Sequence, residues 1–241
     1  MRLNGPAGPN CAERALPRRV AIHTKSVGCW FMTLGFVRPA RLDDVVEIAR
    51  IQLTTWRVAY RRLLPKHILD QLDEEWITRR WREAITEPPS PAHRVLVAIE
   101  QIDAPGSESG AGPESSYVVG FAASGPADDT ALAPDEDHNT LDKAFESTVA
   151  ITDLLVEPRW GRRGHGSRLL AASVDLWRTD GFTTALAWTF ADDRVTRQFL
   201  QSAGWAPDGA RRSLDVDDML VPQIRWHTSL EADSEDPVIA T

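Results

Sequence analysis

The sequence predicts a single α+β domain built around a mixed, mostly antiparallel sheet with helices packed against it. Three strand-like runs, RVLVAIE (94–100), YVVGFAAS (117–124) and VAITDLLV (149–156), follow one another without an intervening helical pattern. Parallel neighbours would need long crossover connections, so adjacent runs of this kind favour antiparallel pairing. The 241 residues suit one domain with extensions better than two domains.

The first half of the chain begins with a short strand and two helices. LGFVRP (34–39) reads as a strand that ends at its proline. A helix is expected from Leu42, because one face carries apolar residues at 42, 45, 46, 49 and 53. Asp43 and Asp44 then lie in its first turn, where the helix dipole favours negative charge. A second helix carries Ile77, Trp81, Ala84 and Ile85 on one stripe and is broken by PPSP (88–91).

The second half alternates helices and strands. The helix after strand 149–156 has Leu169, Leu170, Val174 and Trp177 on one face and ends near Gly181. The remaining elements are a strand at 185–190, a helix at 194–204 closed by Gly204, and final strands that include 221–230. Two polar stretches, 103–116 and 125–142, are predicted to be loops because of their glycine, serine, proline and aspartate content.

The termini are expected to lie outside the domain, which we place at 32–230. Residues 1–31 lack a sustained period and are interpreted as a loosely ordered extension, with Met32 as a hypothetical alternative start. Residues 231–241 are interpreted as an acidic, disordered tail. Both cysteines, Cys11 and Cys29, fall in the extension, which argues against a disulfide framework, a zinc site or a cysteine nucleophile.

Charge and hydropathy exclude several classes of protein. The net charge of −8 opposes a generic nucleic-acid or anionic-membrane binder. No apolar run approaches the ~18–20 residues of a membrane span, and no secretory signal is recognised. We therefore expect a cytoplasmic protein with no bound metal.

The segment VEPRWGRRGHGSRLL (156–170) predicts an anion site. It joins an apolar strand to a helix through three glycines with two arginines between them. Glycine allows close approach to the backbone, and the first amides of the helix lack intrahelical acceptors. The spacing excludes GxxxxGK[ST], and GxGxxG would need a glycine where Leu169 stands. Glycine spacing alone leaves a simple turn with solvated arginines as an equal alternative.

The context of this corner resembles the GNAT superfamily of acyl-CoA-dependent N-acyltransferases. That family carries a strand ending in V-x-P, then [Q/R]-x-x-G-x-[G/A], then a helix, as Val156, Pro158 and 161–166 do here. TTWRVAYRRLLP (54–65) and RQFLQSAGWAPDGARR (197–212) are similar to two further family segments, so the resemblance spans about 34–230. It implies helices on both faces of the sheet, a splayed pair of strands, and acetyl transfer from acetyl-CoA to an amine.

The resemblance also implies where the cofactor binds. Backbone amides would hold the CoA diphosphate, and the pantetheine arm would lie along Leu155 and Val156, with an amide near Val156 polarising the thioester carbonyl. The amides belong to Arg162, Arg163, Gly164, His165, Gly166 and Ser167. Three positions depart from the family: Gly161 replaces glutamine or arginine, His165 an aliphatic residue, and Asp193 an asparagine.

The sequence leaves the catalytic residue open. An amine with a pKa of ~10.4 is neutral in about one molecule in 2,500 at pH 7, so a base or a pKa-lowering pocket is needed. The family's glutamate and tyrosine positions are Ala150 and Leu200 here. The remaining candidates are Thr152, Glu146, Tyr60, and Asp153, which strand alternation turns away from Ala150 unless a bulge intervenes.

Three aromatic residues are candidates for the acceptor pocket. Trp56, Tyr60 and Trp188 would line it, or would serve as core aromatics. Aromatic walls would suit a cationic amine. The acceptor itself stays open between a small amine, an amino acid, an antibiotic and a protein lysine. A catalytically weak acyl-CoA-binding or sensing module is the alternative function, and a homodimer is suggested only by the resemblance.

Overall fold

The computed structural model describes residues 34–102, 115–131, 133 and 146–231. All of them belong to one compact unit that begins at Met32. The predicted N-terminal extension, and all of the predicted tail except Glu231, lie outside the described residues.

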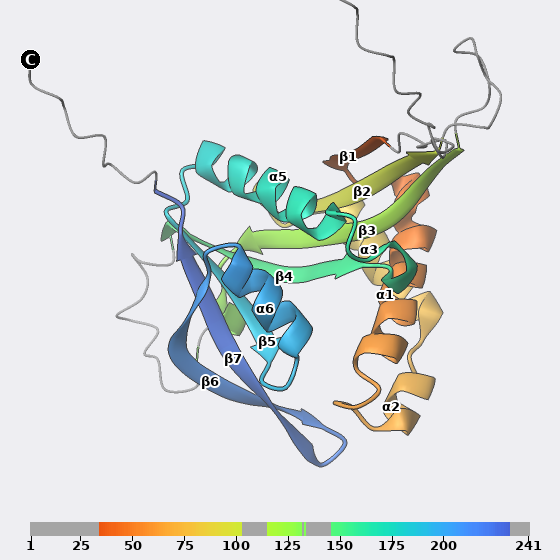
Figure 1. Cartoon of the computed structure of the whole chain (residues 1–241), viewed down its shortest axis with the longest axis vertical. Coiled ribbons are helices and arrows are strands. Elements are labelled where there is room, and N and C mark those ends of the chain that lie inside the picture. Colours follow the sequence, from red (N-terminus) through yellow and green to blue (C-terminus); the bar gives the residue numbers. More distant parts are fainter. Residues whose placement is uncertain (1–33, 103–114, 132, 134–145, 232–241) are drawn as a thin grey trace, which may run out of the picture. The chain divides into compact units, whose positions relative to one another are not determined.

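The described residues form one seven-stranded sheet with the order β1-β2-β3-β4-β5-β7-β6 (Figure 1). The strands are β1 (Leu34–Pro39), β2 (Arg94–Ile102), β3 (Ser115–Pro126), β4 (Thr148–Val156), β5 (Thr184–Phe190), β6 (Ala206–Val216) and β7 (Met219–Ser229). Every neighbouring pair is antiparallel except β4 with β5, which is parallel. The expected mixed, mostly antiparallel sheet is confirmed.

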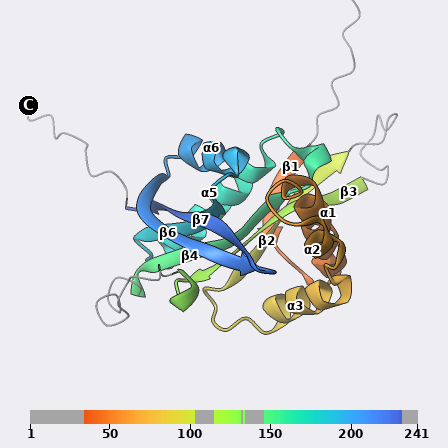
Figure 2. The ribbon, with the colours of Figure 1, turned by 90° about the horizontal axis from the view of Figure 1, so that it is seen from below.

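Helices cover both faces of this sheet. The helices are α1 (Val45–Ala59), α2 (Lys66–Asp70), α3 (Glu74–Thr86), α5 (His165–Thr179) and α6 (Arg194–Ser202). Figure 2 shows α5 and α6 on the opposite side of the sheet from α1 and α3. Two apolar cores result, one between the sheet and α5–α6 and one between the sheet and α1–α3. No helix of the described chain is long and apolar enough to cross a membrane.

The predicted helices form where their apolar stripes can be buried. The stripe of α5 places Leu169, Leu170 and Trp177 in the core, as expected. Helix α3 buries Ile77 and Trp81 and is capped by Asp73, whose carboxylate accepts hydrogen bonds from two backbone amides. Its end at Thr86, just before PPSP, agrees with the predicted break.

Trp177 connects α5 to the sheet and is expected to be a major source of stability. Its side chain is 1% exposed, and its indole nitrogen donates to Ser124 Oγ at 3.0 Å. Replacing Trp177 with alanine should lower the free energy of unfolding by about 3–5 kcal/mol. Trp76, which is 50% exposed, is the matched control and should cost less than about 1 kcal/mol. Urea unfolding of the two variants measures this difference, and equal losses would contradict it.

Strands β4 and β5 pair only at one end and then separate. Thr148–Ile151 pairs in parallel with Thr184–Ala187, whereas β4 continues to Val156 and β5 to Phe190 without a shared ladder (Figure 1). The expected splayed pair is therefore present. Beyond Ile151, β4 stays paired with β3, and its backbone groups on the β5 side have no strand partner in the described chain.

Two elements were not specified by the sequence. The five-residue α2 was not anticipated, and β6 was included only in an unspecified set of final strands. The side chains of β6 alternate between exposed and half-buried, without an apolar face that a pattern would reveal. Its pairing with β7 depends on backbone hydrogen bonds at the edge of the sheet.

Candidate functional site

The glycine corner follows β4 directly. A 3-10 turn (Pro158–Trp160) leads into Gly161, and α5 begins at His165. Arg162 and Gly164 have φ angles of 64° and 82°, in the left-handed region. Glycine adopts this conformation without the steric cost that an L side chain would pay. The chain thus reverses within four residues and presents the N-terminus of a 15-residue helix beside the end of β4.

The backbone amides of this corner are available to a ligand. The Gly161 amide donates to Pro158 O at 3.1 Å, and the Arg168 amide donates to Gly164 O at 3.0 Å. Between them, the amides of 162–167 donate to no acceptor within the described chain. Six successive amides at a helix N-terminus, where the dipole is positive, form a site for an anion.

Glu157 fixes the position of the corner. Its amide donates to Val119 O of β3 at 2.9 Å, and its carboxylate accepts two hydrogen bonds from Arg50 of α1, at 3.0 and 3.1 Å. Arg159 adds a contact of 2.8 Å. Burial opposes ionisation of Glu157, but Arg50 and Arg159 outweigh it and hold the pKa below its ordinary value. The corner is therefore tied to both a strand and a helix.

The side chain of His165 points inward, not toward the open amides. It is 2% exposed, and its Nε2 lies 3.3 Å from Glu100 Oε2, while neither ring nitrogen makes a hydrogen bond. Burial lowers the pKa of the imidazole, which favours the neutral form. Arg163 instead lies over the Trp160 ring, 4.8 Å from its centroid, with an exposed side chain. His165 therefore contributes its backbone amide to the anion site, and its side chain does not.

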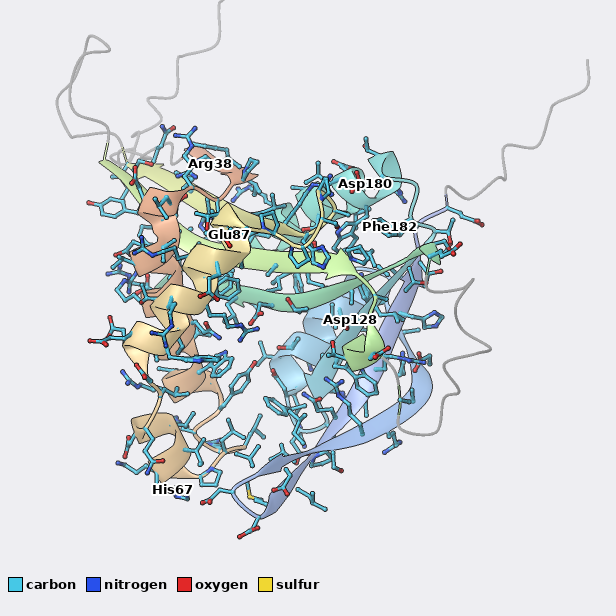
Figure 3. All side chains as sticks on the ribbon, turned by 180° about the vertical axis from the view of Figure 1, so that it is seen from behind. Arg38, His67, Glu87, Asp128, Asp180 and Phe182 are labelled. Carbon is cyan, nitrogen blue, oxygen red and sulfur yellow. The ribbon has the colours of Figure 1, made fainter. Side chains whose placement is uncertain are left out.

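A cavity of about 160 Å³ lies on the face of the sheet covered by α1–α3. It is lined by residues of α3, the β3 end and β4, including Arg80, Ala123, Thr130, Ala150, Thr152 and Asp153. In Figure 3, Asp128, which also lines this cavity, lies on the segment that follows β3. The figure also shows His67 of α2 beside the β6–β7 hairpin, where its imidazole contacts the Asp217 carboxylate.

A β-bulge in β4 brings Asp153 into this cavity. Ile151 lies opposite Ser124 and Asp153 opposite Ala123, so Thr152 is an extra residue in β4. The expectation that Asp153 turns away from Ala150 held only in the absence of a bulge, and this bulge reverses the side-chain parity beyond it. Asp153 and Ala150 line the same cavity.

The pKa values of Asp153 and Tyr60 are both raised, and the charge of Asp153 contributes to the shift of Tyr60. Burial raises the pKa of the Asp153 carboxyl above its ordinary value, against the opposing effects of Arg80 and Thr152. Burial also raises the pKa of the Tyr60 hydroxyl, and the charges of Asp193 and Asp153 raise it further. A carboxyl group shifted toward neutrality can accept a proton, and the tyrosine stays protonated. Asp153 and Tyr60 are therefore the titratable candidates for proton transfer on this side of the sheet.

Aromatic rings surround Tyr60. Its ring meets the edge of Phe190 of β5 at a centroid distance of 4.9 Å and lies 6.1 Å from Trp56. The Tyr60 hydroxyl makes no hydrogen bond to any described residue. Trp56 and Tyr60 thus lie together, on the same face as Asp153.

Comparison with known proteins identifies the family. The model of the Acetyltransferase (GNAT) family matches residues 70–205, more than half of the chain. The chain belongs to the GNAT family of acetyltransferases. It is therefore an acyltransferase, and the predicted resemblance to this family is confirmed.

Individual relatives of this GNAT protein agree with the family. An uncharacterized N-acetyltransferase, YuaI of Bacillus subtilis (strain 168), is 24% identical over 63% of this chain and 69% of its own length. PaiA N-acetyltransferase from Thermoplasma acidophilum, solved with coenzyme A, matches with a TM-score of 0.53 at 12% identity, over 81% of this chain and 99% of PaiA. The yncA protein of Salmonella typhimurium, solved with acetyl-CoA, matches with a TM-score of 0.55 at 17% identity, over 83% of this chain and 95% of yncA. These structures share the fold.

Other candidate residues of this acetyltransferase have structural roles. Leu200, at the family's tyrosine position, is buried in the core, and Glu146 is exposed before β4. Asp193 caps α6, accepting from the Thr196 amide at 3.1 Å and its hydroxyl at 2.6 Å. Trp188 donates its indole N–H to Ala131 O at 3.1 Å, and its ring meets two guanidinium groups of the chain itself.

Proposed function

We propose that this GNAT protein transfers the acetyl group of acetyl-CoA to a primary amine by direct attack in a ternary complex. One observation carries the proposal: six open amides at 162–167 lie next to a parallel strand pair that separates after Ile151. The diphosphate of acetyl-CoA would bind these amides, and Arg162 and Arg163 add positive charge. The complexes of PaiA with coenzyme A and of yncA with acetyl-CoA support this cofactor.

The opening between the strands would receive the pantetheine arm. The amide of Glu157 points to β3, where it donates to Val119 O. Amides of adjacent residues in a strand point to opposite edges, so the amide of Val156 is directed toward the opening. It would donate to the thioester carbonyl, next to Leu155, as the negative charge develops on that oxygen. A groove of about 430 Å³ between α5 and α6, lined in part by Ser167, leaves room for the nucleotide half.

The amine would enter from the cavity on the opposite face. Asp153 accepts a proton from the ammonium group, and the neutral nitrogen attacks the thioester carbon. The C–S bond of the tetrahedral intermediate breaks as Tyr60 donates a proton to the leaving thiolate, and the nitrogen gives up its second proton to the Tyr60 phenolate, which restores the hydroxyl. The products are an acetamide and free CoA. Trp56 and Tyr60 form the aromatic wall of the acceptor site.

The proposal is tested first by cofactor binding and then by turnover. Acetyl-CoA at 100 times its Kd should stabilise the native state by about 2.7 kcal/mol. For a domain of this size, that is a rise in Tm of about 5–10 °C. Thiol release should then appear with members of a broad panel of primary amines. An unchanged Tm contradicts the cofactor site, whereas stabilisation without thiol release favours an acyl-CoA-binding module.

A further inference from the structure

The β5–β7–β6 part of the sheet carries two arginines on the acceptor face, which is the face where Asp153 and the cavity of about 160 Å³ lie. The guanidinium carbon of Arg212 lies 4.3 Å from the Trp188 ring centroid, and that of Arg225 lies 5.7 Å from it. Trp188 and Arg225 are opposite each other on β5 and β7. Along β5, Ala185 and Ala187 belong to the core under α5. Because side chains alternate along a strand, Trp188 points to the other face, where Asp153 lies.

The two arginines differ in their partners. Arg225 donates from Nε to the Asp208 carboxylate at 2.6 Å. Arg212 donates from Nε to Gln223 Oε1 at 2.7 Å and from Nη1 to the carbonyl of Thr130, and both acceptors are neutral. No carboxylate of a described residue contacts Arg212. Burial and the nearby charge of Arg225 lower the pKa of Arg212, as expected for a cation without a compensating anion.

Arg212 contacts a residue that lines the cavity proposed for the acceptor. Thr130, whose carbonyl it contacts, lines the cavity together with Asp153. Gln223, which holds its Nε, lies opposite Phe190, and the Phe190 ring packs against Tyr60. Hydrogen bonds to two neutral acceptors and stacking on Trp188 hold the guanidinium in one orientation. A planar, oriented guanidinium is suited to bidentate binding of a carboxylate.

We propose that the acetyl acceptor is an amine that also carries a carboxylate, as an amino acid does, and that Arg212 binds this carboxylate. The inference rests on the proposed acetyltransferase function. It replaces the expectation that Trp188 attracts a cationic acceptor, because the ring face already has a guanidinium of the chain beside it. The acceptor carboxylate supplies a negative charge that none of the described residues places against Arg212, while its amine is presented to Asp153.

The test compares each of the twenty L-amino acids with its own carboxamide in the thiol-release assay. The carboxamide has nearly the same shape but lacks the negative charge, and its amine is the less basic of the two. We expect one or more amino acids to be acetylated with a kcat/KM at least about tenfold higher than that of the matched amide. Amides that react as well as the acids overturn the inference and leave the acetyltransferase function intact.

A variant then assigns the effect to Arg212. Arg212→Gln should raise KM for the preferred acid about 10- to 100-fold with little change in kcat, and leave the amide unaffected. Arg211→Gln is the matched control, because exposed Arg211 lies opposite Ile224, whose side chain packs into the core on the α5 side. Equal behaviour of the two variants overturns the role of Arg212.

The failure of the inference is distinguishable from failure of the proposed function. Silence of all acids and amides, while acetyl-CoA still raises the Tm, counts against a carboxylate-bearing acceptor. Silence together with an unchanged Tm counts against the acetyltransferase site itself.

Discussion

Replacing Gly164 with aspartate is expected to abolish the rise in Tm that acetyl-CoA produces. The substitution places a carboxylate among the open amides of 162–167. This carboxylate would accept hydrogen bonds from the amides proposed to bind the diphosphate, and its negative charge would repel the diphosphate. Gly164 also has a φ of 82°, which an L side chain adopts only at a cost of about 1–2 kcal/mol. We expect affinity for acetyl-CoA to fall at least about 100-fold, measured by titration calorimetry and thermal shift.

Gly181→Asp separates the loss of the site from general backbone strain. Gly181 follows the other end of α5 with a φ of 88°, and a side chain there meets open space. Both variants therefore pay a similar conformational cost, and their Tm values without ligand should fall by similar amounts. Only Gly164→Asp should lose cofactor binding. A Gly164→Asp protein that folds and still binds acetyl-CoA with unchanged affinity would refute the anion site.

The fold could be predicted where side chains carry the pattern. The buried stripes of α1 and α5 repeat with the helical period, because one face of each helix is buried. The central strands β2 and β4 appear as continuous apolar runs, because helices cover both faces of the sheet. The edge strand β6 has no such face, and its residues pair with β7 through the backbone. A backbone interaction of this kind leaves little signal in the side chains.

The candidate site was predictable to different extents on its two sides. The cofactor corner depends on glycines and helix amides, which the sequence shows directly, and the splayed strands follow from the family resemblance. The face of Asp153 could be predicted only conditionally, because its orientation depends on a bulge at Thr152 in the pairing with β3. A bulge is a property of two strands, and the sequence of β4 alone does not reveal it. Arg80 and Arg212 reach the acceptor face from elements that are distant in sequence.

Replacing Asp153 with asparagine is expected to lower kcat by about 100- to 1,000-fold, because the amine loses its base. The pH dependence should identify the residue. Burial raises the pKa of Asp153, so the wild-type rate should rise with pH through a value above that of an ordinary carboxyl group. This rise of the rate with pH, the acidic limb of the profile, should disappear in Asp153→Asn. Steady-state rates measured from pH 5 to pH 9 with a reactive amine test both expectations, and Asp43→Asn, at an exposed position before α1, is the control.

The substitution Asp153→Asn is expected to lower kcat without lowering the stability of the native state. A carboxyl group with a raised pKa in the folded state binds its proton more tightly there than in the unfolded chain, so the native state loses stability as the pH rises from the unfolded pKa through the folded one. Asparagine carries no charge at this half-buried position, and Asp153→Asn should therefore unfold at an equal or higher temperature than the wild type at neutral pH. A variant that is stable but slow identifies Asp153 as a functional group retained at a cost to the fold. If kcat and its acidic limb are unchanged in this variant, Asp153 is not the base.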